Sequence, residues 1–331
     1  MKLALEPLAA VASVVLLASC SGGGAAPSSS TGSTSSASSS TAASSSSGGT
    51  GGAGGQSATG SGGGAGGSTS IPGWTLVWSD EFDGPDGSAV DPTKWAYGGP
   101  QDGQYNQELE YYNPTTDNVF VAGGNLHLVA KALPAGGAGL TCWNGACQYT
   151  SGKIQSKAPG QPSLYAKQFG RFSARMKIPA GQGVWPAFWM LGSNDDTATW
   201  PVCGEIDAME NIGKDPATTY GTVHGPNASN QNAQLGGSNV LGSGALADDF
   251  HVFAVEWKMG SVTFLIDEAP YFTATPALFQ AQGGTWEFDD HAFYMILNLA
   301  IGGGWPGSPD ANTTFPMEVL VDWVRVYDAA P

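Results

Sequence analysis

The sequence predicts an all-β protein, a β-sandwich of the jelly-roll type, and three observations lead to this prediction. Short runs of alternating apolar and polar residues recur between residues 71 and 331, and Gly and Pro separate them. Apolar residues at helical spacing are hard to find there. The same region holds all eleven Trp, ten Tyr and thirteen Phe residues, which is ample for one large core. We therefore expect a single domain over residues 71–331.

The expected strands combine β-branched or aromatic residues with this alternation. They cover residues 118–121, 125–130, 171–178, 251–257, 262–266 and 317–327. Residues 258–261 are expected to form the turn of one hairpin. Many short strands separated by turn residues are typical of sandwiches and jelly rolls.

Residues 1–20 are expected to be a signal peptide. Lys2 is a lone basic residue, and residues 8–17 form an apolar run that is too short to span a bilayer. The following Leu-Ala-Ser-Cys resembles a bacterial lipobox, which predicts cleavage before Cys20 and lipidation of that residue. An ordinary signal peptide, cut nearby, is the alternative. We expect an exported protein, either a cell-surface or outer-membrane lipoprotein attached to the membrane by this lipid anchor, or otherwise a secreted protein.

Residues 21–70 predict a disordered Gly/Ser-rich linker. They contain only Ser, Gly, Ala, Thr, Pro and Gln. Such a segment cannot bury enough apolar surface to offset its chain entropy. A flexible tether of this kind would hold the following domain away from a membrane, although a plain interdomain linker would have the same composition.

Three carboxylates fall within six positions in residues 203–213, Cys-Gly-Glu-Ile-Asp-Ala-Met-Glu-Asn-Ile-Gly. Apolar residues alternate with Glu205 and Asp207, which predicts a strand with one acidic and one buried face. Strict alternation would send Glu210 into the core, where an unpaired carboxylate is expensive. One extra residue at 208–209, a β-bulge, would return Glu210 to the acidic face, and bulges are enriched beside active sites.

Three carboxylates on one face repel one another, which raises at least one pKa and can leave one group protonated near neutral pH. One ionised carboxylate beside one protonated acid is the apparatus of glycoside hydrolysis. The same spacing is compatible with a metal-binding acidic cluster or with a solvated acidic strand.

Several motifs in one order resemble family 16 of the glycoside hydrolases, and specifically its bacterial endo-β-1,3-glucanases, the laminarinases. Besides Glu-Ile-Asp-Ala-Met-Glu, the similar segments are residues 78–82, 149–152, 183–191 and 321–327, and the similarity spans nearly all of residues 74–327. The resemblance implies a jelly roll with a concave substrate cleft. It also implies retaining endo-hydrolysis of β-1,3-glucan without a cofactor, with Glu205 as nucleophile, Glu210 as general acid/base and Asp207 setting their protonation.

The resemblance further implies the residues that bind sugar. In the family the matching tryptophans line the cleft, since sugar rings present apolar C–H faces that stack on aromatic rings. Outside such a cleft, a Trp is by default a core residue. Trp200 is a weaker candidate for a sugar contact than the other tryptophans. Arg171 follows Phe169-Gly170, where the family usually has Tyr-Gly, and the match around Asn106 is looser. The expected substrate-binding residues are Asn106, Arg171, Trp185, Trp189, His224 and Trp305. A structural role is the alternative for His224.

Family members often carry a structural calcium ion on the convex side of the sandwich. Asp322 matches the aspartate that binds it, and backbone carbonyls from near Glu81 and Gly124 would complete the oxygen ligands that calcium prefers. The alternative is that Asp322 is a solvated strand residue.

Cysteines are few. Cys142 and Cys147 flank a four-residue loop that could close as a disulfide in an exported protein. Cys203 is then expected to be a small buried residue at the start of the acidic strand. The spacing of Cys and His does not suggest a zinc site.

The formal net charge of −16 lies in the folded domain, because Lys2 and Glu6 cancel. A strong negative field disfavours nucleic acid and anionic polysaccharides and suits a neutral β-glucan. We expect a monomer. The alternatives are a non-catalytic β-glucan-binding protein, whose relatives typically lose the acidic signature, or the same chemistry on mixed-linkage glucan or agarose. The lichenases that cleave mixed-linkage glucan typically lack the extra residue, whereas agarases share it.

Overall fold

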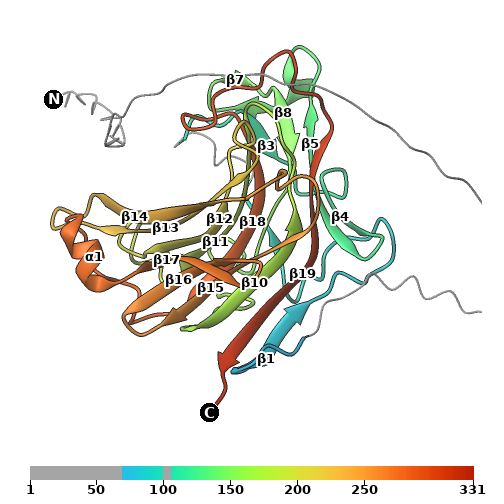
Figure 1. Cartoon of the computed structure of the whole chain (residues 1–331). Coiled ribbons are helices and arrows are strands. Elements are labelled where there is room, and N and C mark those ends of the chain that lie inside the picture. Colours follow the sequence, from blue (N-terminus) through green and yellow to red (C-terminus); the bar gives the residue numbers. More distant parts are fainter. Residues whose placement is uncertain (1–68, 100–105) are drawn as a thin grey trace, which may run out of the picture. The chain divides into compact units, whose positions relative to one another are not determined.

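The structure is a computed structural model of the whole chain, and it describes residues 69–99 and 106–331. The predicted signal peptide, Cys20 and nearly all of the predicted linker lie outside these residues. Two β-sheets pack face to face, and their order in space is drawn in Figure 1. Across the part that is described, no helix has the length and the apolar character needed to cross a membrane.

The larger sheet has ten strands, nearly all antiparallel. Its main path follows the order β17 (Ala269–Ala274), β16 (Ser261–Ile266), β15 (His251–Lys258), β10 (Gly170–Lys177), β19 (Met317–Ala329), β5 (Asn125–Ala132), β8 (Tyr149–Ser151) and β3 (Glu110–Tyr112). Two further strands join it from the side: β1 (Trp74–Asp80) pairs with β19, and β4 (Val119–Ala122) pairs with β5. The pair β3 and β8 is parallel.

The smaller sheet has seven strands. They follow the order β14 (Asn232–Val240), β13 (Thr218–Pro226), β12 (Glu205–Glu210), β11 (Val184–Gly192), β18 (Phe293–Ile301), β9 (Lys153–Gln155) and β2 (Ala96–Tyr97). A separate hairpin joins β6 (Thr141–Cys142) to β7 (Gly145–Ala146), just after a 3-10 turn at Gly137–Gly139. The short helix α1 (Pro276–Ala281) begins at Thr275, whose side chain accepts a hydrogen bond from the Leu278 amide.

The core lies between the two sheets, and the two-residue period of the strands fills it. In β10, Phe172, Ala174 and Met176 belong to the core, whereas Arg171 bonds to acidic residues on the opposite face. In β11, Phe188 and Met190 are fully buried, and Trp185 and Trp189 lie on the other face. The predicted all-β sandwich is therefore confirmed, and the hairpin predicted at residues 258–261 joins β15 to β16.

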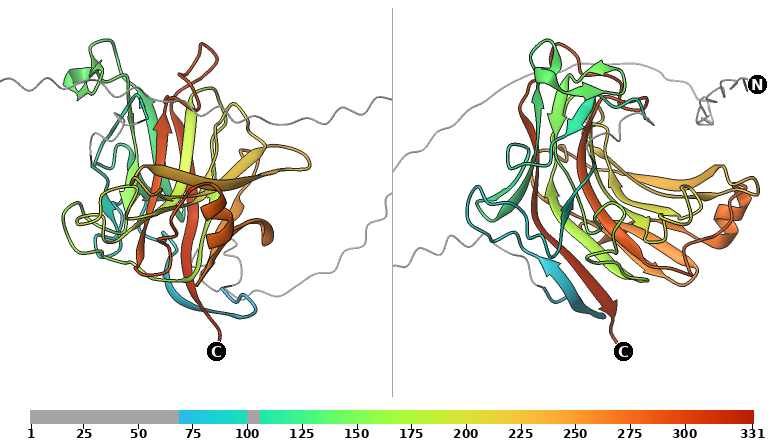
Figure 2. Two further views of the ribbon diagram at one scale, coloured as in Figure 1. Left: turned by 90° about the vertical axis from the view of Figure 1, so that its left-hand side faces the viewer. Right: turned by 180° about the vertical axis from the view of Figure 1, so that it is seen from behind.

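The seven-stranded sheet is curved, and its face away from the ten-stranded sheet lies on the inside of the curve (Figures 1 and 2). We call this the open face. The loop that follows β18, drawn in red, and the hairpin β6–β7 lie together at one end of the domain. The open face carries the acidic strand.

Candidate active site

The acidic strand β12 is an inner strand of the seven-stranded sheet, between β11 and β13. Its register slips as predicted. Asp207 lies opposite Thr222, and Glu210 lies opposite Tyr220, so that two residues of β12 face one residue of β13. Ala208 and Met209 occupy the slip and are buried in the core. This bulge places Glu210 on the same face as Glu205 and Asp207.

His224 completes the acidic cluster from the neighbouring strand β13, directly opposite Glu205. Its Nε2 lies 3.2 Å from Oδ2 of Asp207 and 4.0 Å from Oε1 of Glu205. Its Nδ1 contacts Oδ1 of Asn232 at 3.2 Å. The fold thus places His224 beside the carboxylates, and its predicted contact with substrate stays a prediction.

Two tryptophans each donate a hydrogen bond to one of the two glutamates. Trp185 Nε1 donates to Glu210 Oε1 over 3.0 Å, and Trp200 Nε1 donates to Glu205 Oε2 over 3.0 Å. Trp200 comes from the loop that precedes β12, and its indole is 6.3 Å from the His224 ring. The sequence ranked Trp200 below the other tryptophans, yet it contacts a carboxylate directly.

Burial and mutual repulsion hold protons on this cluster. Burial raises the pKa of Glu210 to about 7, and the charge of Glu205 raises it too, whereas the charge of His224 and the Trp185 hydrogen bond lower it. Asp207 is only 3% exposed. Burial raises the pKa of Asp207 well above its usual value, and the charges of Glu205 and Glu210 add to this. Near neutral pH the three carboxyl groups therefore carry fewer than three negative charges.

His224 is expected to carry a positive charge. Burial by itself lowers the pKa of this imidazole, but the contact with Asp207 and the charges of Glu205 and Glu210 outweigh burial and raise it to about 10. Ligand atoms of Glu205, Asp207 and His224 lie within 4.8 Å of one another, a spacing that a metal ion would also accept. A metal ion could bind there only by displacing the imidazole proton, because a histidine ligand must be neutral.

An aromatic group borders the Glu210 end of the cluster. The Trp305 ring packs edge-on against Trp185 at 5.6 Å and against Tyr220 at 5.0 Å. Trp305 is 38% exposed and follows three glycines, of which Gly303 has a φ of 110° and would bring a Cβ within 3.3 Å of the Trp185 ring. Only glycine allows the loop to approach this closely. Tyr220 was not predicted.

Further along the open face, Trp189 lies on β11 and donates a hydrogen bond from Nε1 to Oδ1 of Asn298 over 2.7 Å. The ammonium of Lys153 lies 5.4 Å from the Trp189 ring. Asn298 donates in turn to the hydroxyl of Tyr112 over 3.1 Å. The sequence did not single out Asn298 or Lys153. Asn298 lies in the otherwise apolar run of β18, and Lys153 directly follows the family-like segment 149–152 without belonging to it.

Asn106 lies against the glycine loop. Its carbonyl accepts a hydrogen bond from the Gly304 amide over 2.8 Å, and its side chain donates to Glu108 over 3.2 Å. Glu110 supports the start of the same loop, because its Oε2 accepts a hydrogen bond over 2.8 Å from the amide of Ile301, the last residue of β18. Burial, and then the neighbouring Glu108, raise the pKa of Glu110 to about 8. The structure thus brings Asn106 near Trp185 and Trp305.

The loop between β11 and β12 is tied down by a buried lysine that the sequence did not reveal. Lys157, 2% exposed, pairs with Asp195 and Asp196 and donates to the carbonyl of Ser193. Tyr294 also donates to Asp195 over 3.1 Å. These contacts fix the loop that carries Trp200. They connect segments far apart in the sequence, so a local pattern could not have predicted them.

The prediction that Arg171 binds substrate is wrong. Arg171 lies on β10 in the ten-stranded sheet, and its two terminal nitrogens bond to Glu256 at 2.9 Å and Glu268 at 2.6 Å. Its strand neighbour Phe172 points into the core, so Arg171 points away from it, to the face of the sandwich opposite the acidic cluster. The guanidinium ties β10 to β15 and to the turn before β17.

The segments predicted to bind calcium meet on β19. Asp80 pairs with Val324, and Leu126 pairs with Val321, so the backbones of Glu81 and Gly124 reach β19 beside Asp322. The Asp322 carboxylate accepts a hydrogen bond from Arg175 through Oδ2 over 2.7 Å. Carboxylate and carbonyl oxygens are the ligands that calcium prefers, and an ion there would share the Asp322 carboxylate with Arg175.

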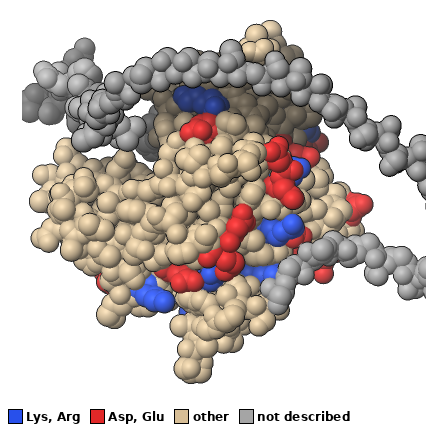
Figure 3. Space-filling view, viewed as in Figure 1, with Lys and Arg blue, Asp and Glu red and all other residues tan. Residues whose placement is uncertain are grey.

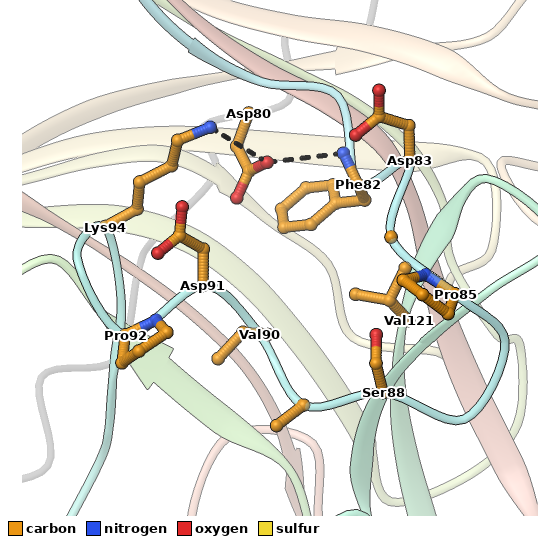
Figure 4. Close-up of a pocket in the computed structure, with 12 residues that line it drawn as sticks. Asp80, Phe82, Asp83, Pro85, Ser88, Val90, Asp91, Pro92, Lys94 and Val121 are labelled. Atoms are coloured by element: carbon orange, nitrogen blue, oxygen red, sulfur yellow. Dashed lines mark hydrogen bonds and ion pairs between the residues drawn. The ribbon is translucent and has the colours of Figure 1, made fainter.

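Another of the family-like segments, residues 78–82, borders a pocket near β1. Asp80 lines it together with Lys94 and Asp91 (Figure 4). Oδ1 of Asp80 accepts from Lys94 over 3.2 Å and from the Phe82 amide over 3.3 Å, and Oδ2 accepts from Trp95 over 2.8 Å. With both oxygens engaged, Asp80 acts as a brace for this loop.

The structure places the three cysteines of the folded domain as follows. Cys142 and Cys147 form a disulfide that closes the hairpin β6–β7, and Cys203 is free and fully buried. The carbonyl of Cys203 contacts Nε2 of His291 at 2.7 Å, immediately before the acidic strand.

Comparisons with known proteins agree with this geometry. Residues 111–325 match the family described as glycosyl hydrolases family 16. A beta-glucanase of Rhodothermus marinus is 37% identical over 269 residues, which cover 78% of this chain and 87% of that protein. Glucan endo-1,3-beta-glucosidase A1 of Niallia circulans is 33% identical over 278 residues, which cover 78% of this chain and 38% of that longer protein. The solved catalytic domain of an endo-1,3-beta-glucanase (laminarinase) from Thermotoga petrophila superposes with a TM-score of 0.68 at 37% identity, covering 78% of this chain and 99% of the other.

Proposed function

The chain belongs to family 16 of the glycosyl hydrolases, and we propose that it is a retaining endo-hydrolase of β-1,3-glucan. The observation that carries this proposal is the bulge in β12, which places Glu205, Asp207 and Glu210 on one open face. Two carboxylates on one face of one strand suit the short separation of a retaining mechanism, because an inverting one needs room for a water between them.

In the first step Glu205 attacks the anomeric carbon. A bond forms between its carboxylate oxygen and that carbon, while the glycosidic bond breaks and the leaving oxygen takes the proton of Glu210. In the second step water attacks the anomeric carbon, Glu210 accepts its proton, and the bond to Glu205 breaks. The pKa of Glu210, about 7, suits a group that must first donate and then accept a proton. This chemistry needs no cofactor.

Asp207 and His224 position and tune the pair. Asp207 lies between the two glutamates in the strand, and its contact with His224 supplies a compensating charge 4.0 Å from Glu205. Trp200 holds Glu205 through its other oxygen. These contacts orient the nucleophile.

The substrate is a neutral polymer. Trp185 and Trp305 provide ring faces beside Glu210, and Trp189 with Asn106 extends the contact surface. Figure 3 displays a broad area without charged side chains over β13, β14 and α1, and basic side chains that adjoin acidic ones elsewhere on that side. A net charge of −16 would repel anionic chains.

Two finer proposals concern the setting of this domain. We propose that the protein is exported and anchored through a lipid on Cys20, because Leu-Ala-Ser-Cys ends the apolar run at its N-terminus. We also propose a structural calcium ion at Asp322 with the carbonyls near Glu81 and Gly124, which the pairing of β1 and β5 with β19 supports. The ion would stabilise the fold and would take no part in the reaction.

The test of the proposed function is a digestion series with laminarin, lichenan, agarose and xyloglucan, followed by product analysis. We expect laminarin to be cleaved internally, so that its viscosity falls before much reducing sugar appears. The control is the Glu205→Ala variant, which lacks the nucleophile. Cleavage of agarose with none of laminarin would reject the assignment, and binding of laminarin without cleavage would point to a glucan-binding protein.

A further inference from the structure

Among the described residues, three tryptophans expose more than a third of their surface. They are Trp143 at 45%, Trp200 at 48% and Trp305 at 38%. Trp200 and Trp305 lie beside the catalytic carboxylates. Trp143 has no place in the proposed site. A single exposed apolar side chain is normal on a protein surface, but a ring that is also held rigid beside a sugar-binding face can serve as a platform for a pyranose.

The Trp143 side chain is held in place. It lies at the tip of the hairpin β6–β7, between two cysteines that are joined by a disulfide. Its Nε1 donates a hydrogen bond to the carbonyl of Glu108 over 2.6 Å. The Sγ of Cys142 also contacts the carbonyl of Glu110 at 3.7 Å. The indole therefore has its only polar atom engaged, which leaves the apolar ring to contact a ligand.

This hairpin is continuous with the sugar-binding face. Glu108 forms a β-bridge with Gly302, at the start of the loop that carries Trp305. The next residue of that loop, Gly303, lies against Trp185, which bonds to Glu210. A line of contacts thus runs from Trp143 through the glycine loop to the proton donor. The hairpin and this loop lie at the same end of the domain (Figure 1).

We propose that Trp143 forms a distal sugar-binding subsite that holds a part of the glucan chain beyond the residues bound at Trp185 and Trp305. This inference rests on the proposed function. Since the indole N–H is already used, the ring would recognise the apolar face of a neutral pyranose rather than a particular hydroxyl. The disulfide reduces the entropy lost on binding, because the hairpin is already ordered.

The test compares Trp143→Ala with wild type on a long laminarin and on a short β-1,3-oligosaccharide that fills only the sites next to Glu205 and Glu210. The ratio of kcat/KM for the long chain to that for the short one should fall about 3- to 10-fold, the range expected for one lost aromatic contact. Met259→Ala is the matched control, because Met259 is exposed in the turn between β15 and β16 of the other sheet. Its ratio should equal that of wild type.

A binding measurement separates this inference from the proposed function. In the Glu205→Ala background, affinity electrophoresis in laminarin gels should reveal weaker retardation when Trp143 is also replaced. A Cys142→Ser, Cys147→Ser variant should weaken retardation in the same direction. An unchanged ratio, or equal losses on long and short chains, would overturn the subsite while leaving the proposed function intact. If wild type neither cleaves nor binds β-1,3-glucan, it is the proposed function that fails.

Discussion

Trp185 donates a hydrogen bond to the carboxyl group of Glu210 over 3.0 Å, so a ring that can stack on sugar is also bonded to the proton donor. This contact lowers the pKa of Glu210, in opposition to burial, which raises it. Substrate contact and proton transfer are thereby coupled through one side chain.

The first prediction concerns the pH dependence of the reaction. Glu210 must be protonated to act as the acid, so kcat/KM should fall as the pH rises through about 7. In Trp185→Phe the hydrogen bond that favours the ionised form is lost, so the pKa of Glu210 should rise and the alkaline limb should move to higher pH.

A pH–rate profile measured on wild type and Trp185→Phe tests this prediction. Trp200→Phe is the matched control, because it removes a similar hydrogen bond from Glu205 instead. It should lower the rate and leave the alkaline limb near its wild-type position. A limb that stays in place in Trp185→Phe would show that another group sets it.

The second prediction concerns stereochemistry. Proton NMR of the first product should detect the β-anomer, as retention requires. With an activated substrate and azide, Glu210→Ala should give the β-glycosyl azide through the covalent intermediate, and Glu205→Ala should give the α-azide by direct attack. Asp207→Asn should slow the reaction without changing the anomer. Initial release of the α-anomer would mean inversion and would remove the roles given to Glu205 and Glu210.

The third prediction concerns Arg171, which lies on the ten-stranded sheet. Arg171→Ala leaves Glu256 without its buried partner, so the free energy of unfolding should fall by about 2 kcal/mol. Because the acidic cluster lies on the opposite face, kcat/KM of the folded enzyme should stay within about twofold of wild type. Chemical denaturation and kinetics at low temperature measure the two effects. A large loss of kcat/KM at unchanged stability would return Arg171 to the substrate site.

The fourth prediction concerns calcium. An ion that binds only the folded state should raise the Tm. At one hundred times its Kd it adds about 2.7 kcal/mol to the free energy of unfolding. Asp322→Ala should abolish the response, whereas Asp91→Ala, in the pocket near β1, should keep it. Differential scanning calorimetry with calcium or a chelator makes the comparison. Equal responses in wild type and Asp322→Ala would place any ion elsewhere.

The fifth prediction concerns the N-terminus. If Cys20 is lipidated, cells fed a labelled fatty acid should incorporate the label into wild type and not into Cys20→Ala. The variant should also leave the membrane fraction. Cys203→Ala is the control for a general effect of removing a cysteine. Unchanged labelling in Cys20→Ala would exclude the lipobox.

Local patterns predicted the features that depend on local spacing. The bulge followed from the cost of burying Glu210, and the strands followed from alternation. The pattern could not place Trp200, because its contact with Glu205 depends on a loop that is fixed by Lys157 from a distant segment. Arg171 was misplaced by the family resemblance. Alternation next to Phe172 indicates that Arg171 faces away from the core, but it does not say which of the two sheets the strand joins.

The bulge in β12 has a consequence for changes in chain length. Deleting Ala208 would leave Glu205, Asp207 and the present Glu210 at alternate positions of a regular strand, and all three would keep the open face. Deleting Ile206 instead would put Asp207 directly after Glu205, so in a regular strand Asp207 would turn into the core and Ala208 would turn out to the open face. An evolving gene can therefore lose one codon at this point and keep its acidic face, while the strand loses the local bend that the bulge gives it.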